Sequence, residues 1–344
     1  MRFKSKLLLS CIGNLLAIVG FSQDINFSQF YELPLLRNPS LAGIYKGDLR
    51  VSSVFRNQWQ SVTVPYQTSA LSVELKSGIS SSSDDFITFG MQMTNDVSGD
   101  SKFGKTQLLP MLTYHKLIYG PTNTYLSVGF LGGPVQQKFD PNALRFDDQF
   151  VAGAYSPFNA TRQSFTSTNL TYWDAAIGLN VSGEIGFSKG YIGAAYYHFT
   201  KPRVAFINSN DIRLNRKFVI NAGLIAPVSD EDDMIYYGDL FFQGGNRQFQ
   251  GGAMFMHHFP NYSEQDDEES GIGFGGFYRW NDAFIPVLKV NWRKFSLGAT
   301  YDINVSSLRS ASSFRGGVEM SLTYKTYLNI LNSSLQKVRC VVPF

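Results

Sequence analysis

Few side chains in this chain of 344 residues have the chemistry of a catalytic or metal site. Its four histidines are His115, His198, His257 and His258. A hydrolase needs a nucleophile, a base and an orienting group within reach of one another, and a metal site needs several converging ligands. His115 and His198 fall in predicted strands, while His257 and His258 would point to opposite faces of one strand. We therefore predict no catalytic residues, no metal ligands and no cofactor, and hence no enzyme.

Two acidic runs offer oxygen atoms of the kind that Ca²⁺ prefers. They are SDEDD at 229–233 and EQDDEE at 264–269. Neither run has the spacing of an EF-hand loop, with its central Gly and terminal Glu, so both are interpreted as solvated turns, with calcium binding left open. Glycine pairs such as Gly132-Gly133 and Gly316-Gly317 precede no predicted helix, as a phosphate-binding loop would require, and instead indicate bends in strands.

The amino end has the features of an export signal. Three basic residues within the first six positions precede an apolar run over 7–19, and small residues lead to Ser22. This order predicts a signal peptide over 1–22, cleaved near Ser22, whereas a lipoprotein site at Cys11 would leave almost no apolar run before it. Cleavage would leave 27 basic and 27 acidic residues, so the charge predicts no nucleic-acid partner. No later apolar run is long enough for a transmembrane helix.

The remaining chain has the composition and the alternation of β-strands. It contains 29 Phe, 18 Tyr and 31 Gly, and only 17% of its residues are charged. Alternating segments separated by turn-rich stretches predict about 14 strands. The predicted strands are 49–59, 67–75, 86–94, 105–118, 124–137, 172–183, 191–200, 217–227, 234–243, 247–258, 271–280, 283–292, 295–305 and 314–326.

The two faces of these segments favour a membrane barrel. In the first, Phe55 and Trp59 lie on one face, and Arg50, Arg56 and Gln58 lie on the other. We expect the aromatic face to contact lipid and the charged face to line a hydrated or plugged interior. A soluble sandwich or propeller would also alternate, but these strands exceed the usual 5 to 6 residues and show no period of 40 to 50 residues. The prediction is an all-β fold, a transmembrane antiparallel barrel of outer-membrane type over 49–326.

Loop lengths give an independent check, because such barrels have longer loops outside than inside. With a periplasmic start, the connections 140–171, 201–216 and 306–313 fall outside, and 184–190 and 293–294 fall inside. The connection 258–270 is an exception, since it is long and predicted to be periplasmic. The long connection 139–165 is rich in aromatic residues, which argues against disorder, and either plugs the lumen or forms a docking surface. Its candidate residues are Phe139, Asp140, Phe146, Asp147, Asp148 and Gln149.

Three short motifs near the amino end resemble a known family. They are Ser28-Gln29-Phe30, Asn38-Pro39-Ser40-Leu41-Ala42-Gly43 and Phe55-Arg56-Asn57-Gln58-Trp59. Together they resemble the start of the PorP/SprF proteins, outer-membrane parts of the type IX secretion system and of gliding motility in Bacteroidota. Cys340, Pro343 and Phe344 loosely match the closing residues of that family. The family-motif residues carried over are Asn38, Pro39, Ala42, Gly43, Arg56, Gln58 and Trp59.

The resemblance implies an outer-membrane protein that assists export or surface retention of an adhesin-like protein through protein contacts. The implied partners are the secreted substrate or its carboxyl-terminal sorting domain, the periplasmic ring components and outer-membrane lipid. A transport channel for a small or apolar solute is the alternative. Residues 23–48 are expected at the periplasmic mouth or in the lumen, where Arg56 and Gln58 could bond their backbone, and 327–344 are expected as a tail or an extension of the last strand.

Overall fold

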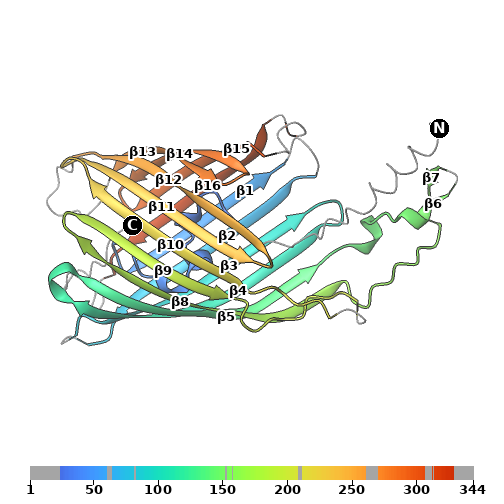
Figure 1. The fold of residues 1–344 in the computed structure, drawn as a ribbon, viewed down its shortest axis with the longest axis horizontal. Helices are drawn as coiled ribbons and strands as arrows, with labels where there is room; N and C mark the ends of the chain where they lie inside the picture. The colour runs from blue at the N-terminus through green and yellow to red at the C-terminus, as the bar shows by residue number, and fades with distance from the viewer. Residues whose placement is uncertain are drawn as a thin grey trace, which may run out of the picture.

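The chain folds into a closed antiparallel barrel of fourteen strands in the computed structural model (Figure 1). The structure describes residues 24–59, 64–80, 83–151, 153–156, 158–207, 211–260, 270–306, 312 and 314–328. The predicted signal peptide and its cleavage point, the acidic run 264–269 and the end of the tail lie outside these residues. Within them, no helix is both long enough and apolar enough to span a membrane.

The strands of the barrel follow the predicted segments closely. They are β1 (Leu49–Gln58), β2 (Tyr66–Gly78), β3 (Phe86–Ser98), β4 (Phe103–Tyr119), β5 (Thr124–Lys138), β8 (Asn169–Ile185), β9 (Ser188–Tyr197), β10 (Lys217–Pro227), β11 (Asp232–Gln243), β12 (Asn246–His258), β13 (Gly271–Arg279), β14 (Ala283–Trp292), β15 (Phe295–Asn304) and β16 (Arg315–Thr326). The fold prediction is confirmed, and two strands, β10 and β14, have the predicted bounds.

The barrel closes where the first strand meets the last. β1 pairs with β16 in a continuous register from Leu49 opposite Thr326 to Gln58 opposite Gly317. Every other barrel strand pairs with its neighbours in chain order, with β5 beside β8. Closure removes the open edges that a sheet would otherwise present to lipid.

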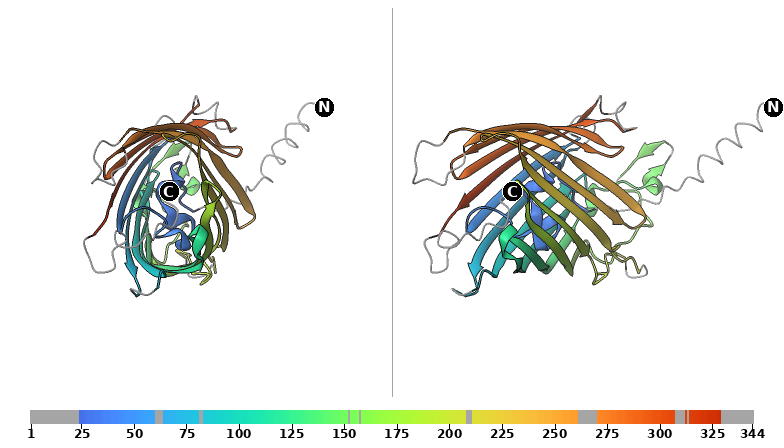
Figure 2. Two further views of the ribbon diagram at one scale, coloured as in Figure 1. Left: turned by 90° about the vertical axis from the view of Figure 1, so that its left-hand side faces the viewer. Right: turned by 60° about the vertical axis from the view of Figure 1, so that its left-hand side comes forward.

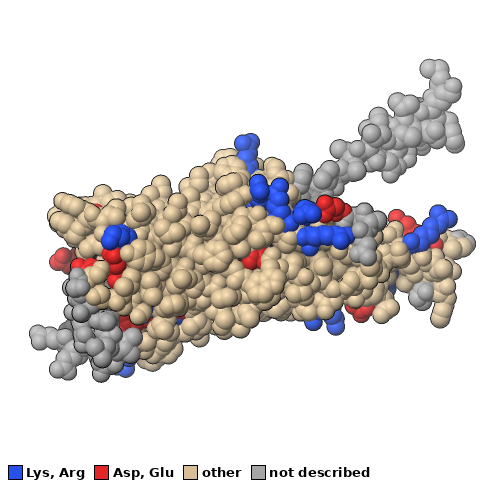
Figure 3. All heavy atoms as spheres, turned by 90° about the horizontal axis from the view of Figure 1, so that it is seen from below, with Lys and Arg blue, Asp and Glu red and all other residues tan. Residues whose placement is uncertain are grey.

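Side chains alternate between an apolar exterior and a polar interior. On β16, Met320 and Leu322 are 59% and 45% exposed, whereas Glu319, Ser321 and Thr323 between and beside them are buried. Charged side chains gather toward the two ends of the molecule, and the wall between them shows few (Figure 3). This alternation is the one required when lipid contacts the outside of the wall.

The two ends of the barrel differ in their connections. One end, the long-loop end, joins β5 to β8 and β9 to β10, and these are the connections that were predicted outside. The other, the short-turn end, has tight turns such as the one between β14 and β15, together with the longer connection between β12 and β13. We assign the long-loop end to the outside of the cell, because outer-membrane barrels have their longer loops there.

Candidate functional site: the filled lumen and the outer loop

Residues 24–48, here called the lumen segment, lie inside the barrel (Figure 2). The segment contains three short helical turns: η1 (Phe30–Glu32), α2 (Pro34–Arg37) and η2 (Pro39–Leu41). It runs from the long-loop end, where Asp24 contacts Lys105 at 3.2 Å, to the short-turn end, where the Asp48 backbone N–H donates to the Thr326 carbonyl at 2.9 Å. Because most of its side chains are buried, it is packed against the inner wall along its length.

A buried network of charges fixes the first part of the lumen segment. The Glu319 carboxylate accepts the backbone N–H groups of Ser28 and Gln29, at 2.7 Å and 2.6 Å. Arg56 donates to the Asn26 carbonyl at 2.7 Å and to Asp302 at 2.8 Å. Charges placed inside a barrel persist because each meets an opposite charge or a backbone group.

Arg279 joins the same network from β13. Its guanidinium donates to the Ser28 hydroxyl at 2.7 Å and lies 3.2 Å from Asp302. Gln250 donates to the Phe27 and Ser28 carbonyls at 3.3 Å and 3.1 Å. Side chains of five strands, β1, β12, β13, β15 and β16, therefore bind residues 26–29, which include the first two residues of the Ser-Gln-Phe motif.

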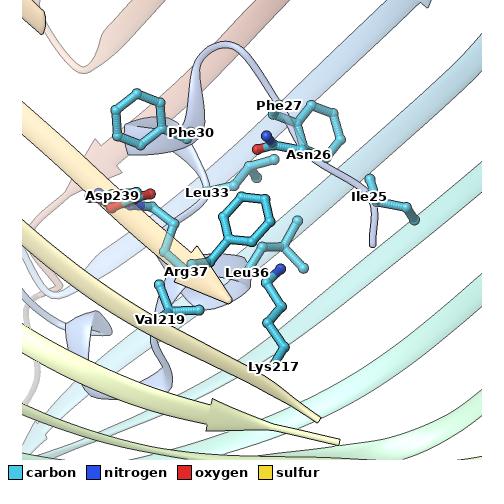
Figure 4. A pocket seen from close by; sticks show the side chains of 11 residues that line it. Ile25, Asn26, Phe27, Phe30, Leu33, Leu36, Arg37, Lys217, Val219 and Asp239 are labelled. Carbon is cyan, nitrogen blue, oxygen red and sulfur yellow. Dashed lines mark hydrogen bonds and ion pairs between the residues drawn. The ribbon is translucent and has the colours of Figure 1, made fainter. Parts of the chain in front are cut away.

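A second ion pair holds the middle of the lumen segment. Arg37 donates to Asp239 of β11, with one Nε to Oδ2 distance of 2.7 Å, and its guanidinium lies 4.8 Å from the centre of the Phe30 ring. A cavity of about 30 Å³ lies beside this pair, between the lumen segment and β10 and β11 (Figure 4). A space of this size holds about one water molecule.

The Asn-Pro motif packs against glycines of the wall. The Asn38 side chain accepts the Ser40 N–H at 3.0 Å and donates to the carbonyls of Leu179 and Ala194 at 3.2 Å and 3.3 Å. A Cβ at Gly129 would lie 2.4 Å from the Pro39 carbonyl carbon, and one at Gly178 would overlap Asn38. These wall glycines therefore make room for the motif.

The last two residues of the Asn-Pro motif are also in the lumen. Ala42 is fully buried, and Gly43 has a φ of +76°, a conformation that favours glycine. The Gly43 N–H donates to Glu74 at 3.0 Å, and Glu74 pairs with Arg50 at 2.7 Å. Arg50 thus lies on the inner face, as its position in the alternation predicted.

The third motif divides between the lumen and the barrel rim. Arg56 makes the bond to the lumen backbone, and Phe55 faces outward with 45% exposure. Gln58 is half-buried at the end of β1, and within the described part of the chain no side-chain hydrogen bond joins it to the lumen segment. Trp59 has a φ of 59° and packs edge to face on Tyr66, with ring centres 5.0 Å apart.

The connection between β5 and β8 stands beyond the barrel end instead of entering the lumen (Figure 1). At its base, Phe139 contacts Phe165 and Phe206, with ring centres 4.9 Å and 5.0 Å apart. It continues through η4 (Pro141–Ala143) and η5 (Asp147–Gln149) to a two-stranded ribbon, β6 (Phe150–Val151) and β7 (Ala154–Tyr155). An aromatic base therefore supports a projecting ribbon.

The connection between β5 and β8 is here called the outer loop, and its polar candidate residues stabilise its backbone. The Asp140 carboxylate accepts the Asn142 N–H at 3.0 Å, and the Gln149 side chain accepts the Phe146 N–H at 3.1 Å. Asp148 accepts the Arg162 N–H at 2.6 Å, and this bond holds the pKa of the Asp148 carboxyl below its usual value. Asp147 begins η5, where a carboxylate is favourable beside free N–H groups.

The ribbon and the residues after it present apolar side chains to solvent. Phe150 and Val151 of β6 are 51% and 59% exposed, and Phe158, beyond β7, is 95% exposed. Exposed apolar residues grouped on a projecting element are typical of a protein contact surface.

The sequence prediction missed the wall residues that bind the lumen segment, chiefly Glu319, Asp302, Arg279 and Asp239. All four are charged residues at inward positions of strands, and that signal was present in the alternation. The sequence places His198 in a predicted strand and predicts no role for it. Instead it lies between Asp24 and Asp174, at 2.6 Å and 2.7 Å.

Within the described residues, no group of His, Cys, Asp or Glu side chains could hold a metal ion. The acidic run at 229–233 contributes pairs to neighbouring histidines, Asp232 with His257 at 2.8 Å and Asp233 with His258 at 2.9 Å.

Solved structures that resemble the chain are bacterial barrels at low sequence identity. The translocator domain of the autotransporter NalP from Neisseria meningitidis has 9% identity and a TM-score of 0.38, covering 82% of this chain and 90% of that one. A Pseudomonas aeruginosa FadL homologue has 8% identity and a TM-score of 0.46, covering 84% and 93%. A mutant of the monoaromatic hydrocarbon channel TodX has 10% identity and a TM-score of 0.45, covering 86% and 94%.

No curated protein matches the chain. The model of one protein family does: type IX secretion system membrane protein PorP/SprF, which matches residues 19–324. The match spans the lumen segment and nearly all of the barrel, and the fold is that of an outer-membrane barrel. The chain therefore belongs to the PorP/SprF family of type IX secretion system membrane proteins, and its place is the outer membrane.

Proposed function

We propose that this barrel works without catalysis, assisting export or surface retention of a secreted adhesin-like protein through protein contacts. The outer loop would contact the secreted protein or its carboxyl-terminal sorting domain, and the short-turn end would face the periplasmic ring components. Family membership supports a role in secretion. A link to gliding motility is part of the same proposal.

The filled lumen is the observation that carries this proposal. Residues 24–48 occupy the space that a solute channel would need. Ion pairs join them to three strands of the wall, Arg37 to Asp239 of β11, Asp24 to Lys105 of β4 and Glu32 to Lys289 of β14. The cavity beside Arg37 and Asp239 measures about 30 Å³, which is room for about one water molecule. A surface suited to recognition of a secreted protein is the long-loop end, where the ribbon of β6 and β7 projects.

Crosslinked pull-down from outer membranes tests the proposal. The native barrel should recover a secreted protein, and the triple variant Phe150→Ser, Val151→Ser, Phe158→Ser should recover several-fold less, because the exposed apolar contacts are gone. Phe187→Ser is a matched control, since Phe187 is 95% exposed but lies in the turn between β8 and β9 at the opposite end.

Two outcomes would count against the proposal. Equal recovery by the native barrel and the triple variant would remove the outer loop from recognition. Recovery of neither a secreted protein nor a ring component by the native barrel would favour the solute channel.

A further inference from the structure

Five exposed basic side chains gather at the long-loop end of strands β9 to β12 and form what we call the basic patch. Lys201, Arg203, Arg213 and Arg216 belong to the connection between β9 and β10, and Arg247 belongs to β12. The sequence of that connection, 198–216, contains one acidic residue, Asp211. Lys and Arg side chains also gather toward this end in Figure 3. The basic patch therefore has an excess of positive charge on the outer rim.

Two arginines of the patch lie directly opposite each other. Arg203 and Arg213 form an antiparallel bridge, flanked by the backbone bonds from Val204 to Ile212 and from Leu214 to Pro202, at 2.8 Å and 2.9 Å. Like charges directly opposite in a β-ladder repel each other. Arg213 meets Asp211 at 3.1 Å, and the Arg203 guanidinium donates to the Ile207 carbonyl at 3.3 Å. The bridge therefore places two arginines opposite each other at the outer rim.

The basic patch adjoins a row of outward-facing side chains. Direct cross-strand partners link Phe130, Ile177, Tyr196, Phe218, Phe242 and Arg247 across six neighbouring strands. Tyr196 stacks on Phe218 with ring centres 4.5 Å apart, and the Arg216 guanidinium lies 5.8 Å from the Tyr196 ring centre. Aromatic side chains near the ends of barrel strands mark the boundary between the hydrocarbon layer and the head groups. Tyr196, Phe218 and Phe242 each lie one residue from the long-loop end of their strand, so Arg216 and Arg247 beside them lie near that boundary.

We propose that the basic patch binds the phosphate group of a phosphorylated glycolipid in the outer leaflet. Planar guanidinium groups form paired hydrogen bonds to phosphate oxygens. Four of the five basic side chains are arginines: Arg203 and Arg213 form the bridge, and Arg216 and Arg247 lie at the row of outward-facing side chains. The acyl chains of the lipid would lie against Phe218 and Phe242, which are 53% and 41% exposed. A soluble phosphate would gain nothing from this apolar surface.

Lipid binding to the purified, full-length barrel in detergent tests this inference, using native mass spectrometry with a phosphorylated lipid A as probe. The native barrel should retain this lipid in preference to the same lipid with its phosphate removed and to phosphatidylglycerol. The triple variant Arg213→Gln, Arg216→Gln, Arg247→Gln should bind it about tenfold or more weakly, because charge-assisted contacts are lost. Arg315→Gln is the matched control, an exposed arginine at the same end but on β16.

The folded state of each variant is checked by its thermal midpoint without added lipid, which should match that of the native barrel. Equal binding of the dephosphorylated lipid would overturn the inference. So would unchanged binding by the folded triple variant, or phosphatidylglycerol binding as tightly as the glycolipid.

Discussion

Arg56 is buried on the inner wall, where its guanidinium meets Asp302 at 2.8 Å, Glu319 at 3.6 Å and the Asn26 carbonyl at 2.7 Å. Removing one partner of a buried ion pair leaves an uncompensated charge, which costs about 3–5 kcal/mol. We expect Arg56→Ala to lower the free energy of unfolding of the detergent-solubilised barrel by about 3–5 kcal/mol, and therefore to lower its unfolding midpoint. Arg315→Ala at the exposed rim should change the midpoint little. An unchanged midpoint for Arg56→Ala would show that the network does not stabilise the fold.

His198 follows the last residue of β9 and provides a test by pH at the same scale. Burial acts to lower the pKa of His198, but the carboxylates of Asp24 and Asp174 outweigh burial and raise this pKa to about 9. Two further cations, Lys105 and Lys217, also lie near the Asp24 carboxylate. A raised pKa means a stabilising contribution that is complete below pH about 6.5 and is lost as the pH rises through about 9. The unfolding free energy of the native barrel, relative to His198→Gln, should fall by on the order of 3 kcal/mol over this interval. A flat difference between pH 6 and 10 would contradict the charged pair.

The η2 turn of the lumen segment packs against four strands of the wall, β4, β5, β8 and β9. At Gly129, a Cβ would lie 2.4 Å from the Pro39 carbonyl carbon and 2.5 Å from the Ser40 nitrogen, and a backbone held by a proline turn has little freedom to move away. We expect Gly129→Ala to destabilise the barrel by about 1–3 kcal/mol through overpacking. Gly238→Ala on β11 is the control, because its Cβ would meet nothing closer than 3.9 Å. Equal unfolding midpoints for the two variants would mean that the lumen segment does not press on the wall.

The molecule as a whole is a barrel whose interior is occupied by its own amino-terminal segment, which predicts its electrical behaviour. In planar lipid bilayers, the native barrel should give no stable ion conductance, because residues 24–48 lie buried in the lumen and are paired to its wall. A variant lacking 25–46 should conduct once it has inserted, since the wall alone encloses a polar interior. Folding of that variant is checked by the shift of its band on unheated gels. Stable conductance by the native barrel would favour the solute-channel alternative over the protein-contact function.

Much of the fold could be predicted from the sequence, because strand alternation is a local property. Side chains at every second position of a strand share a face. Met320 and Glu319 therefore identify the lipid-facing side and the lumen-facing side of β16, and no partner strand has to be known. Loop lengths also predict which end faces outward, and that orientation stays a prediction. The motif Asn38 to Gly43 could be recognised as an ordered turn, since proline fixes φ and glycine permits a positive φ.

Only the tertiary structure decided what the interior does. Glu319 is 291 positions from Ser28 in the sequence, and Asp239 is 202 positions from Arg37. At such separations no local sequence pattern predicts which inward-facing charge binds which part of the lumen segment. The sequence also left open whether the outer loop enters the lumen, because an aromatic stretch suits either place. In the structure the lumen segment occupies the interior, and the outer loop lies beyond the barrel end (Figure 1). Alternation determines which way each side chain points, but the pairing of buried charges depends on closure of the barrel around the lumen segment, which brings distant residues within hydrogen-bonding distance.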